Sequence, residues 1–241
     1  MSPLRVDKTL WPAVALLVAA FLLFEFTGLD LFLQDMLYDF ATHGWLIDRH
    51  DSILRLAFYD LPKVFIIVLG VALLGLTIGP ARWRDRWPLT PPSRRHLFVA
   101  FLTIGTVPAL IGQLKATTNI FCPSEIRRYG GDVPYVRVME RYPADDRPTK
   151  RGRCFPAGHA SGGFALLALC GLGRNRRAQM LGVALGLGFG GAMGFYQMAK
   201  GAHYLSHTVI TALIAWIGFL LWRRALRVAQ IQTQTDETLI S

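Results

Sequence analysis

Three short stretches of the chain combine lysine, histidine and glycine in a way that suits phosphate chemistry. They contain Lys115 in the first stretch, Gly158 and His159 in the second, and Lys200, His203 and His207 in the third. A lysine offers a point positive charge to phosphoryl oxygens, and the backbone N–H groups at the start of a helix favour an anion. Histidine can act as a nucleophile or as a general acid near neutral pH. Together the three stretches predict a site that handles a phosphate group.

Two other interpretations of these residues stay open. His203 and His207 are four residues apart, so on a helix they share one face, and together with His159 they could ligate zinc. Neither a cysteine pair nor a carboxylate accompanies those two histidines, and two lysines at the same place would repel a cation. A lysine at the end of a membrane helix can also serve only as an anchor at the membrane surface. We therefore expect no metal at this site.

The composition indicates which elements must position these residues. Of the 241 residues, 52% are hydrophobic and only 17% are charged, whereas a soluble domain would carry about 25% charged residues. The apolar residues fall into blocks of about 20, the length that crosses about 30 Å of hydrocarbon. We predict an all-α, polytopic bundle of six transmembrane helices that forms a single domain over residues 1–241. The predicted spans are Leu10–Leu31, Pro62–Gly79, Leu97–Leu114, Pro156–Gly173, Ala178–Ala199 and His203–Trp222.

The positive charge is distributed between the apolar blocks. The formal net charge of +10 would suit nucleic-acid binding, but that requires a basic patch on one face. Arginines instead crowd residues 80–96, 174–177 and 223–227, which the positive-inside rule places in the cytoplasm. Both chain ends are then cytoplasmic, and residues 228–241 are expected to form a flexible tail. The three polar stretches lie at the opposite, extracytoplasmic face, beside a long loop between the third and fourth helices.

Two further patterns concern how the helices pack. Gly182, Gly186, Gly190 and Gly194 recur every four residues in the fifth span, which predicts a groove where another helix backbone approaches closely. After the first span, apolar residues recur at helical spacing between residues 33 and 40. This second pattern predicts a short helix that lies in the membrane surface.

The first two polar stretches resemble motifs of the type-2 phosphatidic acid phosphatase family, which are integral-membrane lipid phosphatases with six helices. The family's first motif is lysine, six residues, then Arg-Pro, and here Lys115 is followed after six residues by Cys122-Pro123. Its second motif is Pro-Ser-Gly-His, which is similar to Pro156-Ala157-Gly158-His159. Both motifs occur in the family's order and with its spacing.

The third stretch resembles the family's third motif, which is Ser-Arg, five residues, histidine, three residues and aspartate. This chain has Tyr196-Gln197, His203 and His207 at those positions. Across the three motifs the usual Arg, Ser, Arg and Asp are replaced by Cys122, Ala157, Gln197 and His207. The resemblance is therefore to a divergent branch of the family.

The replacements remove two arginines that would bind phosphate with two parallel hydrogen bonds. Lys200 follows Gln197 by three residues, so it would compensate in part from nearly the same helix face. The outer loop offers further cations, namely Arg127, Arg128 and Arg153.

The resemblance implies a mechanism that uses histidines and needs no metal or other cofactor. His203 would attack phosphorus and form a phosphohistidine, while His159 would protonate the departing oxygen and then act as base toward water. His207 would orient His203. The phosphoryl oxygens would be held by Lys115, Gly158, Lys200 and Gln197.

The resemblance also implies a lipid substrate in the outer leaflet, with its acyl chains remaining among the membrane lipids. The candidates are a lipid A phosphate, undecaprenyl pyrophosphate, phosphatidylglycerol phosphate and phosphatidic acid. We expect a bacterial inner membrane, with the site facing the periplasm, and no nucleic-acid partner. The alternatives are a lipid-to-lipid phosphotransferase, a non-catalytic lipid-binding or transport protein, and an enzyme that acts on a soluble nucleotide or sugar phosphate.

Two of the three cysteines bracket the outer loop. Cys122 and Cys154 each adjoin a motif, whereas Cys170 lies inside the fourth span. Because the extracytoplasmic compartment permits disulfides, we expect Cys122 and Cys154 to pair. Such a bridge would close a loop of about 33 residues and contribute about 3 to 4 kcal/mol through loop entropy. Two free thiols are the alternative.

Overall fold

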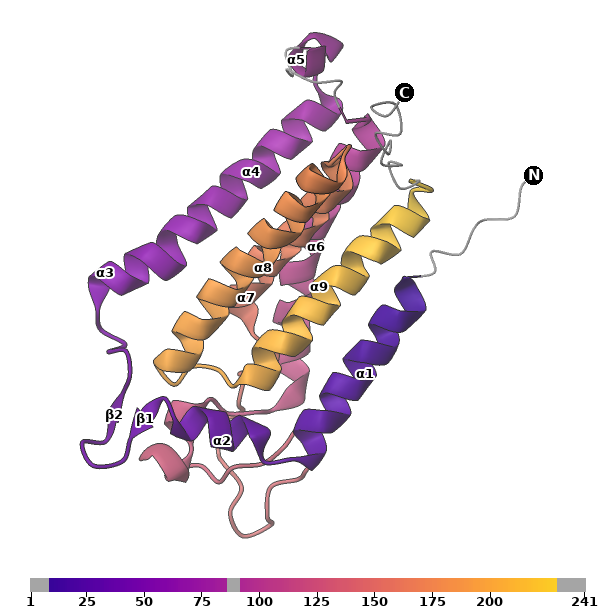
Figure 1. The fold of residues 1–241 in the computed structure, drawn as a ribbon. Helices are drawn as coiled ribbons and strands as arrows, with labels where there is room; N and C mark the ends of the chain where they lie inside the picture. The colour runs from indigo at the N-terminus through magenta and orange to yellow at the C-terminus, as the bar shows by residue number, and fades with distance from the viewer. Residues whose placement is uncertain (1–8, 86–91, 229–241) are drawn as a thin grey trace, which may run out of the picture.

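The computed structural model of the chain describes residues 9–85 and 92–228, which form a bundle of helices (Figure 1). Its helices are α1 (Leu10–Phe26), α2 (Leu29–Asp35), α3 (Ser52–Arg55), α4 (Leu61–Ile78), α5 (Ala81–Asp85), α6 (Arg94–Thr118), α7 (Gly158–Ala165), α8 (Arg176–Ala199) and α9 (Leu205–Ala225). The strands β1 (Tyr38–Asp39) and β2 (Gly44–Trp45) form an antiparallel hairpin. A π-helical stretch, η1 (Leu56–Asp60), joins α3 to α4, and the 3-10 helices are η2 (Pro123–Glu125), η3 (Arg127–Tyr129) and η4 (Leu166–Leu172).

Four helices of the described residues are long and apolar enough to cross a membrane. They are the continuous stretch from α3 to α4 and the helices that contain α6, α8 and α9. A fifth span is obtained if α1 and α2 are taken together as one bent span. Gly158–Leu172, in the region of the predicted fourth span, is a shorter apolar helix. These helices indicate an integral membrane protein. The prediction of six spans is thus confirmed for the second, third, fifth and sixth.

The first predicted span, Leu10–Leu31, is wrong in its last part. α1 ends at Phe26, and the chain bends by 70° before α2 begins. Thr27 takes an extended backbone conformation, and Gly28 precedes the new helix, so the helical hydrogen-bond ladder stops between them. The apolar pattern continued through this bend and therefore did not reveal it.

The short surface helix predicted between residues 33 and 40 corresponds to α2, but its limits differ. α2 begins at Leu29 and ends at Asp35, because the chain then turns into the hairpin that pairs Tyr38 with Trp45. The last apolar residues of the pattern therefore belong to the hairpin. α2 lies across the end of the bundle and packs against α9 (Figure 1).

The two ends of the bundle differ in charge. The start of α1, α5, the start of α8 and the end of α9 lie at one end (Figure 1), and the last three carry or adjoin the arginines at 82–84, 174–177 and 223–224. α2, the hairpin and the segment 119–157 between α6 and α7 lie at the other end. The arginine-rich connections and the three polar stretches are therefore at opposite ends. Residues 229–241 of the predicted tail lie outside the described residues.

Glycines allow α8 to pack tightly against α7 and η4. A Cβ atom at Gly186 would lie 2.5 Å from the backbone nitrogen of Leu167, and one at Gly190 would overlap the ring of Phe164. The other two glycines of the repeat meet the backbone of η4 and a side chain of α9 in the same way. The predicted groove is thus confirmed, and it holds the helix whose first turn carries His159.

This packing predicts that Gly186→Ala destabilises the protein, because the added methyl group would collide with the backbone of η4. We expect a loss of about 1 to 3 kcal/mol in the free energy of unfolding. Gly188→Ala on the same helix is the matched control, since a Cβ atom there has no neighbour within 4 Å. The control should unfold at the wild-type temperature or slightly above it, and thermal unfolding in detergent measures both. Equal midpoints for the two variants would contradict the packing.

Candidate active site

The three polar stretches come together at the end of the bundle that carries the outer loop, opposite the arginine-rich connections at 82–84, 174–177 and 223–224. Lys115 lies in the last turn of α6 and reaches the first turn of α7, where a Cβ atom at Gly158 would be 3.4 Å from its Nζ. His159 is the second residue of α7, and its ring centroid is 6.2 Å from that of His203. His203 lies in the turn between α8 and α9. Residues separated by up to 88 positions in sequence are thus brought close together.

His203 does not belong to the last spanning helix, contrary to the predicted span His203–Trp222. α9 begins at Leu205, so His203 sits in the connection that precedes it. Its side chain is buried, with 2% exposed. Burial, together with the neighbouring positive charges, lowers the pKa of His203 well below its ordinary value. The imidazole is therefore neutral near pH 7 and keeps a lone pair for reaction.

His203 and His207 contact each other through their Nδ1 atoms, which are 3.3 Å apart. The prediction that both histidines lie on one helix face is wrong, because only His207 is helical. The turn before α9 brings His203 against His207. A hydrogen bond between two neutral imidazoles requires that one ring nitrogen carry the proton and the other accept it. The contact therefore occupies Nδ1 of His203 and leaves its Nε2 available.

His159 stands among cations and an aromatic ring. Its ring packs against Tyr59, with centroids 4.6 Å apart, and its Nδ1 is buried without a hydrogen-bond partner in the described residues. The charges of Lys115, Lys200 and Lys63 all act on its imidazole. No ion pair among the described residues includes any of these three lysines. The site therefore carries positive charge that no nearby carboxylate neutralises.

The remaining two predicted phosphate-binding residues lie at the end of α8. Lys200 follows its last residue, and its Nζ is 4.4 Å from the ring centroid of Tyr196. Gln197 is buried, and its Nε2 has no partner in the described residues. A buried amide without an acceptor is costly, so this donor is suited to a ligand oxygen.

Two residues of the site were missed by the sequence reasoning. Tyr59 and Lys63 come from the start of the second span, where η1 passes into α4, and the Nζ of Lys63 is 5.9 Å from the Tyr59 centroid. Neither belongs to a recognisable motif. The sequence offered one indication of Lys63, namely that it lies at the same predicted membrane depth as Lys115.

The turn that carries His203 is held by contacts with the hairpin, α2 and η2. Gly201 adopts a positive φ of 74°, and a Cβ atom there would overlap the ring of Trp45 from the hairpin. The amide of Gln34 in α2 donates to the carbonyl of Met198, and the Ser124 N–H donates to the carbonyl of Gly201. These contacts fix the backbone on both sides of the histidine.

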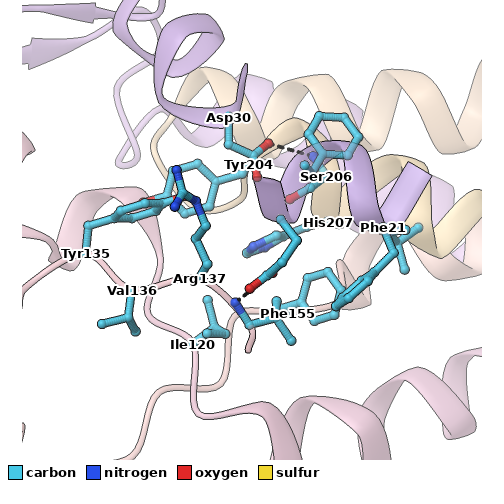
Figure 2. Close-up of a pocket in the computed structure, with 14 residues that line it drawn as sticks. Phe21, Asp30, Ile120, Tyr135, Val136, Arg137, Phe155, Tyr204, Ser206 and His207 are labelled. Atoms are coloured by element: carbon cyan, nitrogen blue, oxygen red, sulfur yellow. Dashed lines mark hydrogen bonds between the residues drawn. The ribbon is translucent and has the colours of Figure 1, made fainter. Parts of the chain in front are cut away.

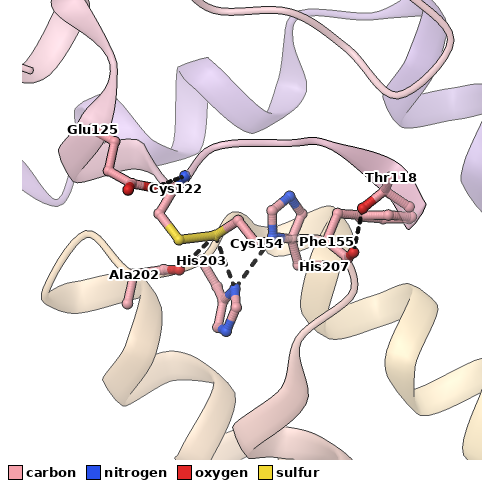
Figure 3. Close-up of a disulfide and its surroundings, with 8 residues drawn as sticks. All are labelled: Thr118, Cys122, Glu125, Cys154, Phe155, Ala202, His203 and His207. Atoms are coloured by element: carbon pink, nitrogen blue, oxygen red, sulfur yellow. Dashed lines mark hydrogen bonds between the residues drawn. A yellow bond between two sulfur atoms is a disulfide. The ribbon is translucent and has the colours of Figure 1, made fainter. Parts of the chain in front are cut away.

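A disulfide joins Cys122 to Cys154, with Cα atoms 5.2 Å apart (Figure 3). The Sγ of Cys154 is 3.4 Å from Nδ1 of His203, so the bridge packs directly on the buried imidazole. Cys154 also donates its N–H to the carbonyl of Ile120, which holds the two ends of the outer loop side by side. The third cysteine, Cys170, is free.

The outer-loop arginines that were considered as phosphate ligands mostly hold the loop. Arg127 pairs with Asp146, and Arg128 pairs with Asp35 at the end of α2, with both atom pairs 2.6 Å apart. The hydrogen bond from Arg128 holds the pKa of the Asp35 carboxyl below its usual range. Arg153 is exposed and occurs in no ion pair among the described residues.

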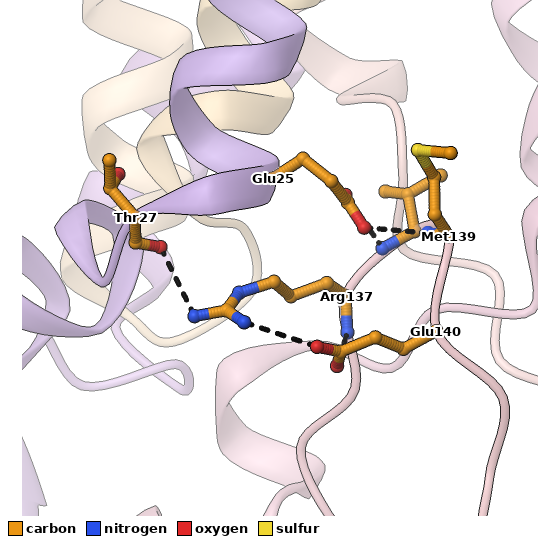
Figure 4. Close-up of polar contacts among 6 residues, drawn as sticks. Glu25, Thr27, Arg137, Met139 and Glu140 are labelled. Atoms are coloured by element: carbon orange, nitrogen blue, oxygen red, sulfur yellow. Dashed lines mark hydrogen bonds and ion pairs between the residues drawn. The ribbon is translucent and has the colours of Figure 1, made fainter.

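The loop is also tied to the end of α1 (Figure 4). Glu25 accepts hydrogen bonds from the backbone N–H groups of Val138 and Met139, and Arg137 donates to the carbonyl of Thr27 and pairs with Glu140. Glu25 is buried, so these two N–H groups stabilise a carboxylate that would otherwise be costly. The loop therefore rests on the first helix and the helices of the site together.

The structure does not bring His159, His203 and His207 together as metal ligands. Among the described residues, the group of possible ligand atoms that lie within 4.8 Å of one another consists of Cys122, Cys154 and His203. Its two sulfur atoms are joined in the disulfide and are therefore not thiolates.

An apolar cavity of about 560 Å³ leads away from His159. It lies between α4, α6 and α7, and its lining includes Lys63, Gly158 and His159 at one end and Ile67 and Val71 of α4 farther along. The last two side chains are more than half exposed on the outside of the bundle. The cavity therefore reaches the surface of α4 that would face lipid.

Comparison with known proteins gives one match. The family model described as the PAP2 superfamily matches residues 96–230, which contain all three polar stretches. The resemblance seen in the motifs is thereby confirmed. Neither a curated protein nor a solved structure matches the chain.

The disulfide predicts a specific stability effect. Replacing both Cys122 and Cys154 by serine should lower the free energy of unfolding by about 3 to 4 kcal/mol, because the cysteines are 32 residues apart and the open loop gains entropy in the unfolded chain. Cys170→Ala serves as the control for loss of a cysteine. Thermal unfolding with and without a dithiol reductant measures the effect. Reductant should lower the midpoint of the wild type and of the control but not of the double variant, and a reductant-insensitive wild type would contradict the bridge.

Proposed function

The chain belongs to the PAP2 superfamily, and from this premise we propose that it is an integral-membrane phosphatase that hydrolyses a lipid phosphate or diphosphate through a phosphohistidine on His203. Members of the superfamily generally hydrolyse phosphate esters. The apolar helices agree with a phosphatase embedded in a membrane. The proposal concerns the nucleophile, the acid, and the lipid nature of the substrate.

The observation that carries the proposal is the pair of histidines with cations around it. The rings of His159 and His203 are 6.2 Å apart between centroids, so a phosphate bound beside them would lie near both. Lys115, Lys200 and Lys63 surround this space without carboxylate partners among the described residues. A trianionic transition state would be stabilised by such fixed positive charge.

In the first half of the proposed reaction, Nε2 of His203 attacks phosphorus in line with the departing oxygen. The N–P bond forms as the P–O bond to the lipid breaks. His159, which holds a proton once the bound phosphate anion offsets the charges of the lysines, gives that proton to the leaving oxygen. Nδ1 of His203 stays in contact with His207, which keeps the ring oriented. The products of this half are a free lipid alcohol, or a lipid monophosphate if the substrate is a diphosphate, and a phosphohistidine.

In the second half, His159 takes a proton from a water molecule, and the water oxygen attacks the phosphorus. The N–P bond breaks, inorganic phosphate leaves, and His203 returns to its neutral form. His159 is again protonated and ready for the next substrate. Lys115 and the N–H group of Gly158 would hold the phosphoryl oxygens in both halves, since they lie next to each other at the start of α7.

The apolar cavity supports a lipid substrate. It begins at His159, where the leaving group would depart, and reaches the outer surface of α4. A hydrocarbon chain could occupy the cavity while the phosphate reaches the lysines. A soluble nucleotide or sugar phosphate would place a polar group against this apolar wall, which is unfavourable.

The sidedness follows from the same distribution of charges that the sequence predicted. If the arginine-rich end is cytoplasmic, the site faces the periplasm of a bacterial inner membrane and takes its substrate from the outer leaflet. The disulfide beside His203 suits that oxidising compartment.

We expect His203→Ala and His159→Ala each to reduce phosphate release by at least about 100-fold, because each would remove a group that takes part in bond making or proton transfer. The measurement is inorganic phosphate released by the purified protein from lipid phosphates and diphosphates in detergent. With a ³²P-labelled substrate, the quenched wild type should carry acid-labile, base-stable label, and His203→Ala should carry none. His50→Ala, an exposed histidine of the outer segment, is the matched control.

Three outcomes would contradict parts of the proposal. Full activity of either active-site variant would remove the proposed mechanism. Label on an acceptor lipid in place of free phosphate would identify a phosphotransferase. No release from any lipid phosphate, with lipid binding retained, would identify a non-catalytic lipid-binding protein.

A further inference from the structure

A second, much smaller cavity of about 30 Å³ lies beside His207, where α1, α2, α9 and the outer loop meet (Figure 2). Asp30, Arg137, Tyr204 and His207 are among its lining residues. This volume is enough to hold one water molecule. In Figure 2 the His207 ring lies among Asp30, Tyr204 and Arg137.

The polar atoms around this cavity fit a buried water molecule. The hydroxyl of Tyr204 and the Nε of Arg137 are both buried without a hydrogen-bond partner in the described residues. Buried polar groups of this kind are normally satisfied by protein or by ordered water. A water here could accept hydrogen bonds from two of the donors around it and would still have both its protons to donate.

Two carboxylates, Glu25 and Asp30, line the cavity. Glu25 already receives the N–H groups of Val138 and Met139, one on each oxygen. Asp30 is 7% exposed, and its Oδ1 accepts the N–H of Ser206 in the first turn of α9. Neither carboxylate is in an ion pair with an arginine or lysine, since Arg137 pairs with Glu140. Asp30 is thus a buried carboxylate that contacts Ser206, three residues after His203.

The proposed reaction creates a need for negative charge at this place. When Nε2 of His203 bonds to phosphorus, its ring becomes positively charged, and its Nδ1–H must then be held by an acceptor. The motif of the family has a carboxylate for this purpose where this chain has His207. A neutral imidazole accepts the hydrogen bond but brings no negative charge.

We propose that Asp30 is a positioning residue that supplies this charge through His207. Nδ1 of His207 accepts a hydrogen bond from Nδ1–H of His203. Nε2–H of His207 donates to a water in the small cavity, which donates in turn to Asp30. No proton has to move along this chain, because each hydrogen bond only polarises the next. This inference rests on the proposed function and assigns the residue that replaces the missing motif carboxylate.

The role differs from that of a helix cap. Asp30 also stabilises the start of α9 through Ser206, but an asparagine could still accept that N–H, since its side chain keeps an oxygen. Asp30→Asn removes the negative charge but keeps an oxygen for this N–H, and the Ser206 hydroxyl, which also bonds Asp30, can turn to accept from the new amide. A structural cap therefore predicts little change in this variant, whereas the relay predicts slower chemistry.

A double-mutant cycle tests the relay. His207→Asp puts a carboxylate directly beside His203, so it should make the distant one dispensable. In the wild-type background we expect Asp30→Asn to lower kcat about 10- to 100-fold, the size of one hydrogen bond to a charged group, with a much smaller change in KM. In the His207→Asp background the same substitution should change kcat less than about threefold. Farnesyl monophosphate and farnesyl diphosphate in detergent serve as substrates, with release of inorganic phosphate as the readout.

Glu25→Gln is the matched control, because it removes the other carboxylate of the same cavity. Equal losses from Asp30→Asn in the two backgrounds would overturn the relay, and so would a Glu25→Gln variant that reproduces the background-dependent loss. If His207→Asp does not fold, the single-turnover rate of protein phosphorylation decides. That rate should fall at least about tenfold in Asp30→Asn and stay at the wild-type value in Glu25→Gln. A wild-type protein with no phosphatase activity refutes the proposed function, whereas an active protein with additive losses refutes only this inference.

Discussion

The contact between the Nδ1 atoms of His203 and His207 is the interaction on which the rest of the site depends, because it decides which nitrogen of His203 can react. Two neutral rings form this hydrogen bond only when their nitrogens are aligned, so the turn before α9 has to be rigid. The protein provides that rigidity with elements far apart in sequence. Gly201 packs under Trp45 of the hairpin, and Cys154 of the disulfide packs on the imidazole itself. Preorganisation of this kind lowers the reorganisation needed during reaction.

The outer loop, residues 119–157, shows what the residues at two replaced motif positions and their neighbours do in this fold. Cys122 stands where the family has an arginine, and here it anchors the loop to Cys154 beside His203. Arg127 and Arg128 follow within six residues, but they bind carboxylates and dock the loop on itself and on α2. Cations near the phosphate space come instead from the helices, chiefly as lysines. The positive charge near the histidines thus comes from the helices of the bundle, while Arg127 and Arg128 hold the loop in place.

Sequence reasoning succeeded where a property repeats along the chain or a motif has fixed spacing. Hydrophobic blocks located α4, α6, α8 and α9, and spacing located Lys115, His159 and His203. Sequence reasoning failed where residues far apart in the chain make contact and no motif or periodic pattern marks them. Asp30 meets Ser206 across 176 positions, and Lys63 meets the site only because α4 packs beside α7. The bend after Phe26 was missed for a related reason, since hydrophobicity continues through it and only backbone geometry marks it.

Some residues around the site lie inside the part of the chain that matches the family and others lie outside it. This distribution suggests that the reacting groups and the groups that select the substrate come from different helices. The histidines, Lys115 and Lys200 lie within the residues that match the family, whereas Lys63 and much of the apolar cavity wall come from α4, outside the match. Lysines without carboxylate partners repel one another, so the empty site is electrostatically unfavourable and an anion relieves that repulsion. Any anionic phosphate benefits from this effect. If the substrate is a lipid, as we propose, discrimination among lipids would arise where their hydrocarbon chains differ, along the wall that α4 contributes.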